Sequence, residues 1–216
     1  MRYRNRTHAG IVLAEALAQA GFGTLALQVV VAGVARGGVA VAAPVAAAFS
    51  ARLEVVIARK LRAPQNPELA IGAVGAGGEA FVDEVLVRRL GVDEAYLGAE
   101  VARQRADIAD RARRYGVTAS GPAVADCEVV VVDDGVATGA TLIAALRSIR
   151  SAGPRRLVCA VPVGPADTLT TLERECDLVV CPMRPQRFAA VGEWYTDFTQ
   201  TDDEEVMALL VPPSRP

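Results

Sequence analysis

Apolar residues recur along the chain in short runs that glycine, proline and charged residues separate. Near the N-terminus, residues 5–20 place apolar side chains on one face at helical spacing, and two glycines end the run. A β-branched, apolar stretch then predicts a strand that leads through a glycine-rich loop into a buried helix and a second strand. These elements are expected at residues 24–31 for the strand, 33–38 for the loop, 39–50 for the helix and 53–58 for the second strand.

The middle of the chain is predicted to be less regular. Pro64 and Pro67 follow the second strand and indicate that residues 61–68 lack regular structure, within a mobile loop over residues 61–78. The further elements expected here are a hairpin with strands at 69–74 and 79–85 and an arginine-rich, solvent-facing helix at 93–115.

The second half of the chain alternates between apolar runs and helical patterns. Four consecutive valines follow Glu128, which is typical of a strand buried on both faces of a parallel sheet. The alternation predicts an α/β fold, a doubly wound, mainly parallel sheet flanked by helices, in a single domain over residues 1–216 with a core over about 5–181. The elements expected are a strand at 128–132, a helix at 140–152, a strand at 156–162, a helix at 166–174 and a strand at 178–181.

Composition narrows the class of protein. The 216 residues are 52% hydrophobic, yet the apolar stretches at 24–34 and 39–49 are interrupted, so we expect a cytoplasmic protein without a membrane partner. The N-terminal basic segment lacks a signal-peptide core. A net charge of −2 argues against nucleic acid as a partner. Four irregularly spaced cysteines and one histidine favour buried thiols over a zinc site.

The candidate chemistry lies where the valine strand ends. Asp133 and Asp134 are followed by small residues that enter a helix, and ligands of open α/β sheets bind at this end of the strands. The amides from Ala137 to Thr141, the helix dipole and two threonine hydroxyls suit one phosphate group. The paired carboxylates suit the two hydroxyls of a ribose or a hydrated Mg²⁺ ion. A surface acidic turn is the alternative, but it leaves the threonines unexplained.

This segment, Val129 to Thr141, resembles the phosphoribosyl pyrophosphate signature of type I phosphoribosyltransferases. Two other interpretations fail: the chain has no Walker A loop, and the glycines at 75–78 lie between strands rather than opening a helix. The resemblance implies that Mg²⁺ is held by Asp133 and Asp134. It implies phosphoribosyl pyrophosphate binding by Asp133, Asp134, Gly135, Val136, Ala137, Thr138, Gly139, Ala140 and Thr141.

Two further segments resemble parts of the same family. Ala35, Arg36, Gly37 and Gly38 are similar to its pyrophosphate loop, although a plain strand-to-helix turn is the alternative. Arg59 and Lys60, before a proline-bearing loop, resemble the Arg-Lys pair of the adenine and xanthine branches. Lys60 is the one lysine among 23 basic residues, so it is the leading candidate for a basic group near the pyrophosphate, with an exposed strand end as the alternative.

The aromatic segment over about 182–200 is similar to the family's small C-terminal hood. Val191 to Phe198 loosely resembles a hypoxanthine-guanine motif, which implies that Phe188 or Trp194 stacks on the acceptor and that Asp197 lies near a second metal ion. Core packing is the alternative for these aromatic residues. The hypoxanthine-guanine branch has an aspartate at the position of Ala137, whereas the adenine branch has alanine there too, so the general acid or base stays unassigned.

The resemblance implies an enzyme that transfers the 5-phosphoribosyl group from phosphoribosyl pyrophosphate to a nitrogenous, base-like acceptor in nucleotide salvage. It implies Asp133, Asp134, Lys60 and Arg36 as the catalytic set and a homodimer as the assembly. The start of the chain, Arg6 to Gly10, is shared with a group of uncharacterised bacterial phosphoribosyltransferases and names no acceptor. The alternatives are a regulator that binds phosphoribosyl pyrophosphate without turnover and an unrelated hydrolase, which lacks a nucleophile elbow and has only His8 as a base.

Overall fold

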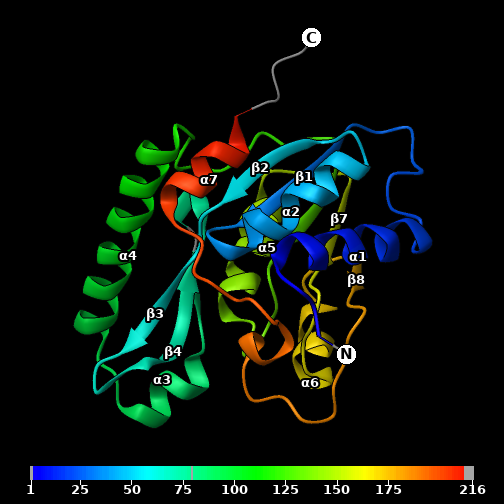
Figure 1. Cartoon of the computed structure of the whole chain (residues 1–216). Coiled ribbons are helices and arrows are strands. Elements are labelled where there is room, and N and C mark those ends of the chain that lie inside the picture. Colours follow the sequence, from blue (N-terminus) through cyan, green and yellow to red (C-terminus); the bar gives the residue numbers. More distant parts are fainter. Residues whose placement is uncertain (1, 79, 212–216) are drawn as a thin grey trace.

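A five-stranded parallel sheet forms the centre of the computed structural model, which describes residues 2–78 and 80–211 (Figure 1). Its strand order is β2-β1-β6-β7-β8, and helices cover both of its faces. This arrangement confirms the predicted α/β class. The strands are β1 (Val29–Val34), β2 (Arg52–Val56), β6 (Glu128–Val132), β7 (Arg156–Ala160) and β8 (Leu178–Val180), and the covering helices are α1 (Arg6–Gln19), α2 (Gly37–Ala48), α5 (Ala140–Ser151) and α6 (Ala166–Leu172).

The valine run of β6 is buried because it lies between β1 and β7 and has a helix layer on each side. Val130 and Val132 pack with α1 and α2, whereas Val129 and Val131 pack with α5 and α6. All four valines have no exposed surface, which accounts for a strand without polar alternation. At the start of the strand, the buried Glu128 carboxylate accepts hydrogen bonds from Arg156 Nη1 at 2.7 Å and from the backbone amide of residue 23 at 3.0 Å.

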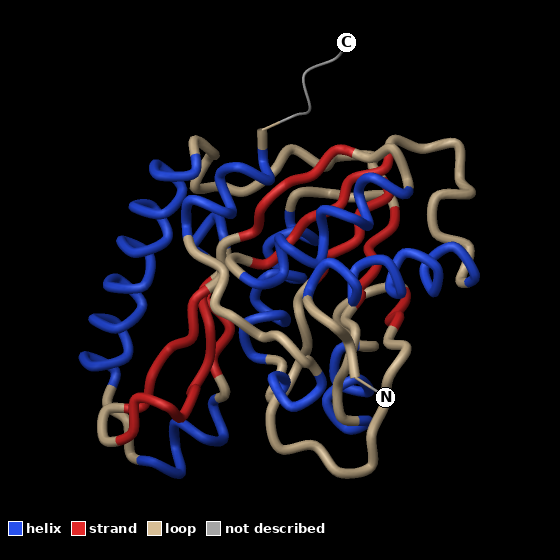
Figure 2. Tube along the Cα trace, in the orientation of Figure 1, coloured by secondary structure: helices blue, strands red, loops and turns tan. Residues whose placement is uncertain are grey.

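A second, smaller sheet projects from one end of the first, and Figure 2 shows the two groups of strands apart. It has the antiparallel order β3-β4-β5, and the long helix α4 runs alongside it. Leu61 and Ile71 of this sheet pack against Ile108 and Ala112 of α4. The elements are β3 (Arg59–Ala63), β4 (Asn66–Val74), the 3-10 turn η1 (Ala76–Gly78), β5 (Ala80–Val82), α3 (Glu84–Leu90) and α4 (Glu94–Tyr115).

The prediction that residues 61–68 lack regular structure is wrong. Ala63 pairs with Asn66, so Pro64 occupies a two-residue turn between β3 and β4. Pro67 lies at a register shift between β3 and β4, in a part of β4 that does not pair with β5. At this position no hydrogen bond of the sheet requires the backbone amide that proline lacks. The mobility of 61–78 stays a prediction.

Other element boundaries also differ from the prediction. Residues 24–28 do not belong to a strand, and β1 continues to Val34. Within β1, Gly33 lets α2 pack closely, because a Cβ at this position would lie 2.6 Å from Val39 Cα. The expected second hairpin strand at 79–85 is only β5, since Asp83 caps α3 by accepting a hydrogen bond from the Leu86 amide at 2.9 Å. Residue 79 lies outside the described residues.

The C-terminal part crosses back over the strand ends and adds a short turn, η2 (Val191–Trp194), and a last helix, α7 (Asp203–Leu210). Helix α7 packs between α2 and α4 (Figure 1). All four cysteines are free and buried, as expected. Among the described residues, no helix has the length and apolar character needed to cross a membrane.

Candidate functional site

The loop that follows β6 encloses a small cavity at the carboxyl end of the sheet. Gly139, with a φ of 81°, turns the chain into α5, and no side chain among the described residues caps this helix. The first amides of α5 are therefore available to an anion. The cavity measures about 180 Å³ and is lined by Lys60, Asp133, Gly135, Val136, Ala137, Thr138, Gly139, Ala140, Thr141, Leu142 and Val191.

Three separate segments thus meet at this cavity. Lys60 comes from β3, Asp133 and the loop to Thr141 come from the end of β6, and Val191 comes from the aromatic C-terminal segment. The structure brings together most of the residues that the sequence suggested for phosphate binding. The close fit of Val191 against Gly135, where a Cβ would meet its methyl group at 2.5 Å, keeps the loop under the C-terminal segment.

The two aspartates have different surroundings, a distinction that the sequence pattern does not contain. Asp133 lines the cavity, and its Oδ1 accepts a hydrogen bond from the Asp134 amide at 2.9 Å. Burial raises the pKa of the Asp133 carboxyl well above its usual range, and the neighbouring Asp134 carboxylate raises it further. Lys60 and Arg6 oppose this increase in the pKa. A cation or a hydrogen-bond donor next to Asp133 would therefore stabilise its ionised carboxylate.

Asp134 faces Arg6 instead. Its Oδ2 accepts a hydrogen bond from Arg6 Nε at 2.8 Å and forms an ion pair with Arg6 Nη2, which lies 2.7 Å away. Burial raises the pKa of Asp134, and the Arg6 guanidinium opposes that increase. Arg6 also donates from Nη1 to the carbonyl oxygen of Thr199 at 2.6 Å, and its guanidinium carbon lies 4.0 Å from the centre of the Phe198 ring. Sequence reasoning gave Arg6 no role; its only signal was the shared Arg-x-x-Ala-Gly start.

The predicted pyrophosphate loop, which contains a cis peptide bond between Ala35 and Arg36, lies directly against these aspartates. A Cβ on Gly37 would clash with Asp134 Oδ2, and a Cβ on Gly38 would lie 3.0 Å from Asp133 Oδ1. Because a larger residue has no room at either position, only glycine allows the start of α2 to approach the end of β6 this closely.

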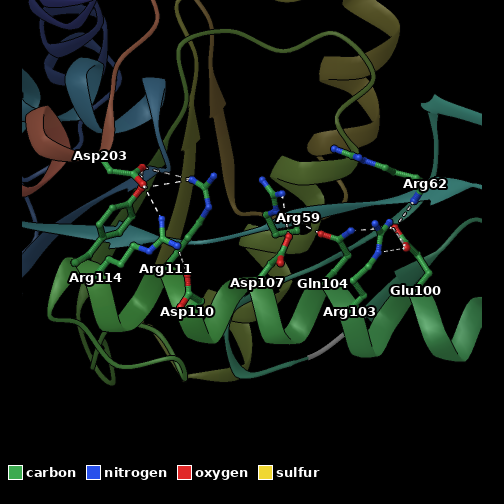
Figure 3. A network of polar contacts seen from close by, with 11 residues as sticks. Arg59, Arg62, Glu100, Arg103, Gln104, Asp107, Asp110, Arg111, Arg114 and Asp203 are labelled. Atoms are coloured by element: carbon green, nitrogen blue, oxygen red, sulfur yellow. Dashed lines mark hydrogen bonds and ion pairs between the residues drawn. The ribbon is translucent and has the colours of Figure 1, made fainter.

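The Arg36 side chain turns toward α7 rather than into the cavity. Its Nη1 lies 3.8 Å from Asp203 Oδ1. The same carboxylate lies 3.8 Å from Arg111 and 3.7 Å from Arg114 and accepts a hydrogen bond from the Tyr115 hydroxyl at 2.7 Å. Figure 3 shows Asp203 at one end of a series of polar contacts along α4.

Arg59 lies near the middle of that series, whose other end is at Glu100 and Arg62 (Figure 3). Its Nε donates to Gln104 at 3.4 Å and its Nη2 to Asp107 at 3.2 Å. Because neighbouring residues of a strand point to opposite faces, Arg59 contacts α4 while Lys60 lines the cavity. Of the two predicted basic residues, only Lys60 lies at the cavity.

The C-terminal aromatic segment is fixed by the start of the chain. The Tyr3 amide donates to the Trp194 carbonyl at 2.8 Å, and the Thr196 amide donates to the Tyr3 carbonyl at 2.8 Å. The Tyr195 hydroxyl donates to the backbone carbonyl of Asp134 at 2.5 Å, and burial raises the pKa of this hydroxyl. The segment therefore rests on the loop that carries the aspartates.

Phe188 and Trp194 form a pair with ring centres 6.5 Å apart and planes inclined by 8°. The Trp194 Nε1 atom is buried and has no hydrogen-bond partner among the described residues. Asp197 instead accepts hydrogen bonds from the Thr199 amide at 3.0 Å and hydroxyl at 2.6 Å. Among the described residues, no group of three or more His, Cys, Asp or Glu side chains could hold a metal ion, and the position of Asp197 near a second metal ion stays a prediction.

The carboxylate chemistry nevertheless fits Mg²⁺. This ion keeps several waters and binds through one or two carboxylates together with substrate phosphates, rather than in a full protein cage. Asp133 lines the cavity and has a raised pKa, so it is the side chain best placed to hold such an ion. Asp134 is the next residue and offers a second carboxylate.

These features define an α/β protein with a glycine-containing loop at the start of a helix and paired carboxylates at the carboxyl end of its central strand. The chain belongs to the phosphoribosyl transferase domain family, whose pattern it matches over residues 6–191. It is 40% identical over 208 residues to a Mycobacterium tuberculosis (strain H37Rv) protein named "Putative phosphoribosyl transferase Rv0571c". That match covers 96% of this chain and 46% of the relative, so the chain spans less than half the length of that protein.

Solved structures share the fold of this chain. The crystal structure of TT1426 from Thermus thermophilus is similar with a TM-score of 0.80 and 47% identity, and the match covers 97% of this chain and 98% of that one. The AQ2163 protein from Aquifex aeolicus, at a TM-score of 0.53 and 13% identity over 87% of this chain and 78% of its own, shares the fold.

Proposed function

We propose that this chain binds phosphoribosyl pyrophosphate and transfers its 5-phosphoribosyl group to a nitrogenous, base-like acceptor, with release of pyrophosphate. One observation carries the proposal: Lys60, Asp133 and the phosphate loop line a single cavity, although they come from distant parts of the chain. A phosphate-binding loop, a carboxylate for a sugar hydroxyl and a cation for a second phosphate match the charge pattern of this substrate.

The 5-phosphate would bind the loop from Gly135 to Thr141 through backbone amides and threonine hydroxyls. Asp133 and Asp134 would accept hydrogen bonds from the ribose hydroxyls. Mg²⁺, held at Asp133 and Asp134, supplies positive charge to the pyrophosphate when it is bound. Lys60 would contribute a further positive charge. The acceptor nitrogen would attack the anomeric carbon as the carbon–oxygen bond to pyrophosphate breaks, and the acceptor's proton would leave to solvent or to the departing pyrophosphate.

The protein's contribution to such a reaction is position and charge. The loop fixes the sugar phosphate while the cation at Lys60 stabilises the charge that develops on the departing group. Phe188 and Trp194, in the hood, would contact the acceptor. Nucleotide salvage is the corresponding role, and a homodimer the assembly we expect.

Calorimetric titration with magnesium phosphoribosyl pyrophosphate is the first test. Acceptors from the purine, pyrimidine and amine classes would then be added to the same sample, with pyrophosphate release as the readout. Binding together with release on one acceptor is the expected result. Binding without release on any acceptor would contradict turnover and favour a regulator, whereas no binding would contradict the whole proposal.

The aspartates are tested by a double variant, Asp133→Asn with Asp134→Asn. We expect it to lose phosphoribosyl pyrophosphate binding while keeping the fold. The matched control is Asp107→Asn with Asp110→Asn, which removes the same charge from α4, where both carboxylates pair with arginines. Equal affinity of the parent and the first variant would sink the assignment of the ribose hydroxyls to this pair.

A further inference from the structure

Arg6 connects two parts of the site that the sequence does not link. It begins α1, 128 residues before Asp134. Its Nε donates to the Asp134 carboxylate at 2.8 Å, and its Nη2 lies 2.7 Å from the same oxygen in an ion pair. Its third nitrogen donates to the Thr199 carbonyl, and its guanidinium covers the Phe198 ring. All three nitrogens of one side chain are therefore used, two on the loop that carries the aspartates and one on the hood.

The pair lies next to the cavity-lining Asp133 and against Gly37 of the pyrophosphate loop. The Arg6 and Asp134 side chains are only 12% and 16% exposed. A Cβ on Gly37 would meet both of them, in a clash with Asp134 Oδ2 and at 2.9 Å from Arg6 Nε. The guanidinium thus lies between the pyrophosphate loop, the aspartate pair and the hood.

The placement of Arg6 depends on the hood in turn. Asn5 caps α1 through a hydrogen bond from the His8 amide at 2.9 Å, and the backbone of Arg4 accepts one from the Asp197 amide at 2.9 Å. The residues just before Arg6 are therefore paired with the hood segment, so Arg6 and the hood are held as one unit.

We propose that Arg6 is a positioning residue that joins the phosphoribosyl pyrophosphate site to the hood. Its Nε and Nη2 hold the Asp134 carboxylate against the pyrophosphate loop, and its Nη1 and guanidinium face hold the hood over the cavity at Thr199 and Phe198. The inference rests on the proposed function, because it places Asp134 in the substrate site.

The two contacts are separable by substitution. Lysine keeps the positive charge near Asp134, but its compact ammonium lacks the planar fork and the stacking face. Glutamine removes the charge. Arg6→Gln is expected to weaken binding of magnesium phosphoribosyl pyrophosphate about tenfold or more, as for the loss of hydrogen bonds to a buried charge. Arg6→Lys is expected to recover most of that affinity without restoring the hood.

Hood packing has its own probe, because Trp194 is the one tryptophan of the chain. Quenching of its fluorescence by acrylamide should rise in both Arg6 variants, since each loses the Thr199 and Phe198 contacts. Arg4→Gln is the matched control: Arg4 is exposed, lies two residues earlier and contacts the hood through its backbone. It should show the parent's affinity and quenching.

Circular dichroism melts of all variants establish that they fold. The inference is overturned if Arg6→Gln keeps the parent's affinity and quenching, or if Arg6→Lys recovers neither affinity nor melting temperature, as for a purely structural ion pair. A parent protein that does not bind phosphoribosyl pyrophosphate would overturn the proposed function and the inference together. Normal binding by the parent and by Arg6→Gln would overturn the inference alone.

Discussion

Asp203 should restrain pyrophosphate binding, because it pairs with the arginine of the pyrophosphate loop. Among the described residues Arg36 forms one ion pair, with Asp203 Oδ1 at 3.8 Å. An anion at the loop would compete with this carboxylate for Arg36. Asp203→Asn removes the competing charge but keeps an oxygen that can accept the hydrogen bond from the Tyr115 hydroxyl, which Asp203 accepts at 2.7 Å. The substitution therefore tests the effect of the Asp203 charge while keeping the size and the hydrogen bond of the side chain.

The size of the effect follows from the separation and exposure of the pair. Two unit charges about 4 Å apart interact by about 4 kcal/mol at an effective dielectric constant of about 20. Both side chains are 26% exposed, and measured values for exposed pairs are about 0.2–1 kcal/mol. We take the upper end, about 1 kcal/mol, because the carboxylate also faces two further arginines. Pyrophosphate affinity should then rise about fivefold in Asp203→Asn.

Calorimetry with magnesium pyrophosphate at about 0.1 M and about 1 M salt measures this change, because salt screens exposed charges. The gain should shrink at the higher salt. The control is Asp107→Asn, which removes a carboxylate from the same polar series at a site that pairs with Arg59 at 3.2 Å (Figure 3). Unchanged or weaker binding in Asp203→Asn, or an equal gain in Asp107→Asn, would refute the competition.

Three further predictions concern packing around the site. Gly38→Ala should abolish pyrophosphate binding with little loss of secondary structure, because its Cβ would lie 2.6 Å from a carbonyl oxygen of β6. Calorimetry measures the binding and circular dichroism the secondary structure, and normal binding would contradict the close fit. Glu128→Leu should lower the free energy of unfolding in urea by about 3–5 kcal/mol, since it leaves Arg156 without its buried partner; a loss below about 1 kcal/mol would contradict this role. Tyr195→Phe should cost about 1 kcal/mol by removing the hydrogen bond to Asp134 and should increase Trp194 quenching, and unchanged quenching would disprove its hold on the hood.

The parts of the fold that were predictable from sequence depend on local composition. The valine run of β6 has no polar position, and only a strand covered on both faces tolerates that pattern. The position of the loop from Gly135 to Thr141 was equally predictable, since it directly follows this strand and enters a helix within a few residues. Phosphate binding by the loop stays a prediction.

The features that were missed depend on long-range partners. Arg6 reaches Asp134 across 128 residues, and no local pattern distinguishes it from 21 other arginines. The difference between Asp133 and Asp134 is equally hidden, because it arises from which neighbour each carboxylate meets in the fold. The β3–β4 hairpin was missed for another reason: its prolines occupy a turn and a register shift, positions where proline costs little.

Three arginines around the site form ion pairs with carboxylates. Arg6 pairs with Asp134, Arg36 with Asp203, and Arg59 with Asp107, and each pair joins two different elements of the fold. An anionic substrate that binds one of these arginines must replace a carboxylate as its partner. The cost of that replacement is lowest at Arg36, whose ion pair at 3.8 Å is longer than that of Arg6 at 2.7 Å. The arrangement favours an exchange at the pyrophosphate loop while the Arg6 connection to the hood stays in place.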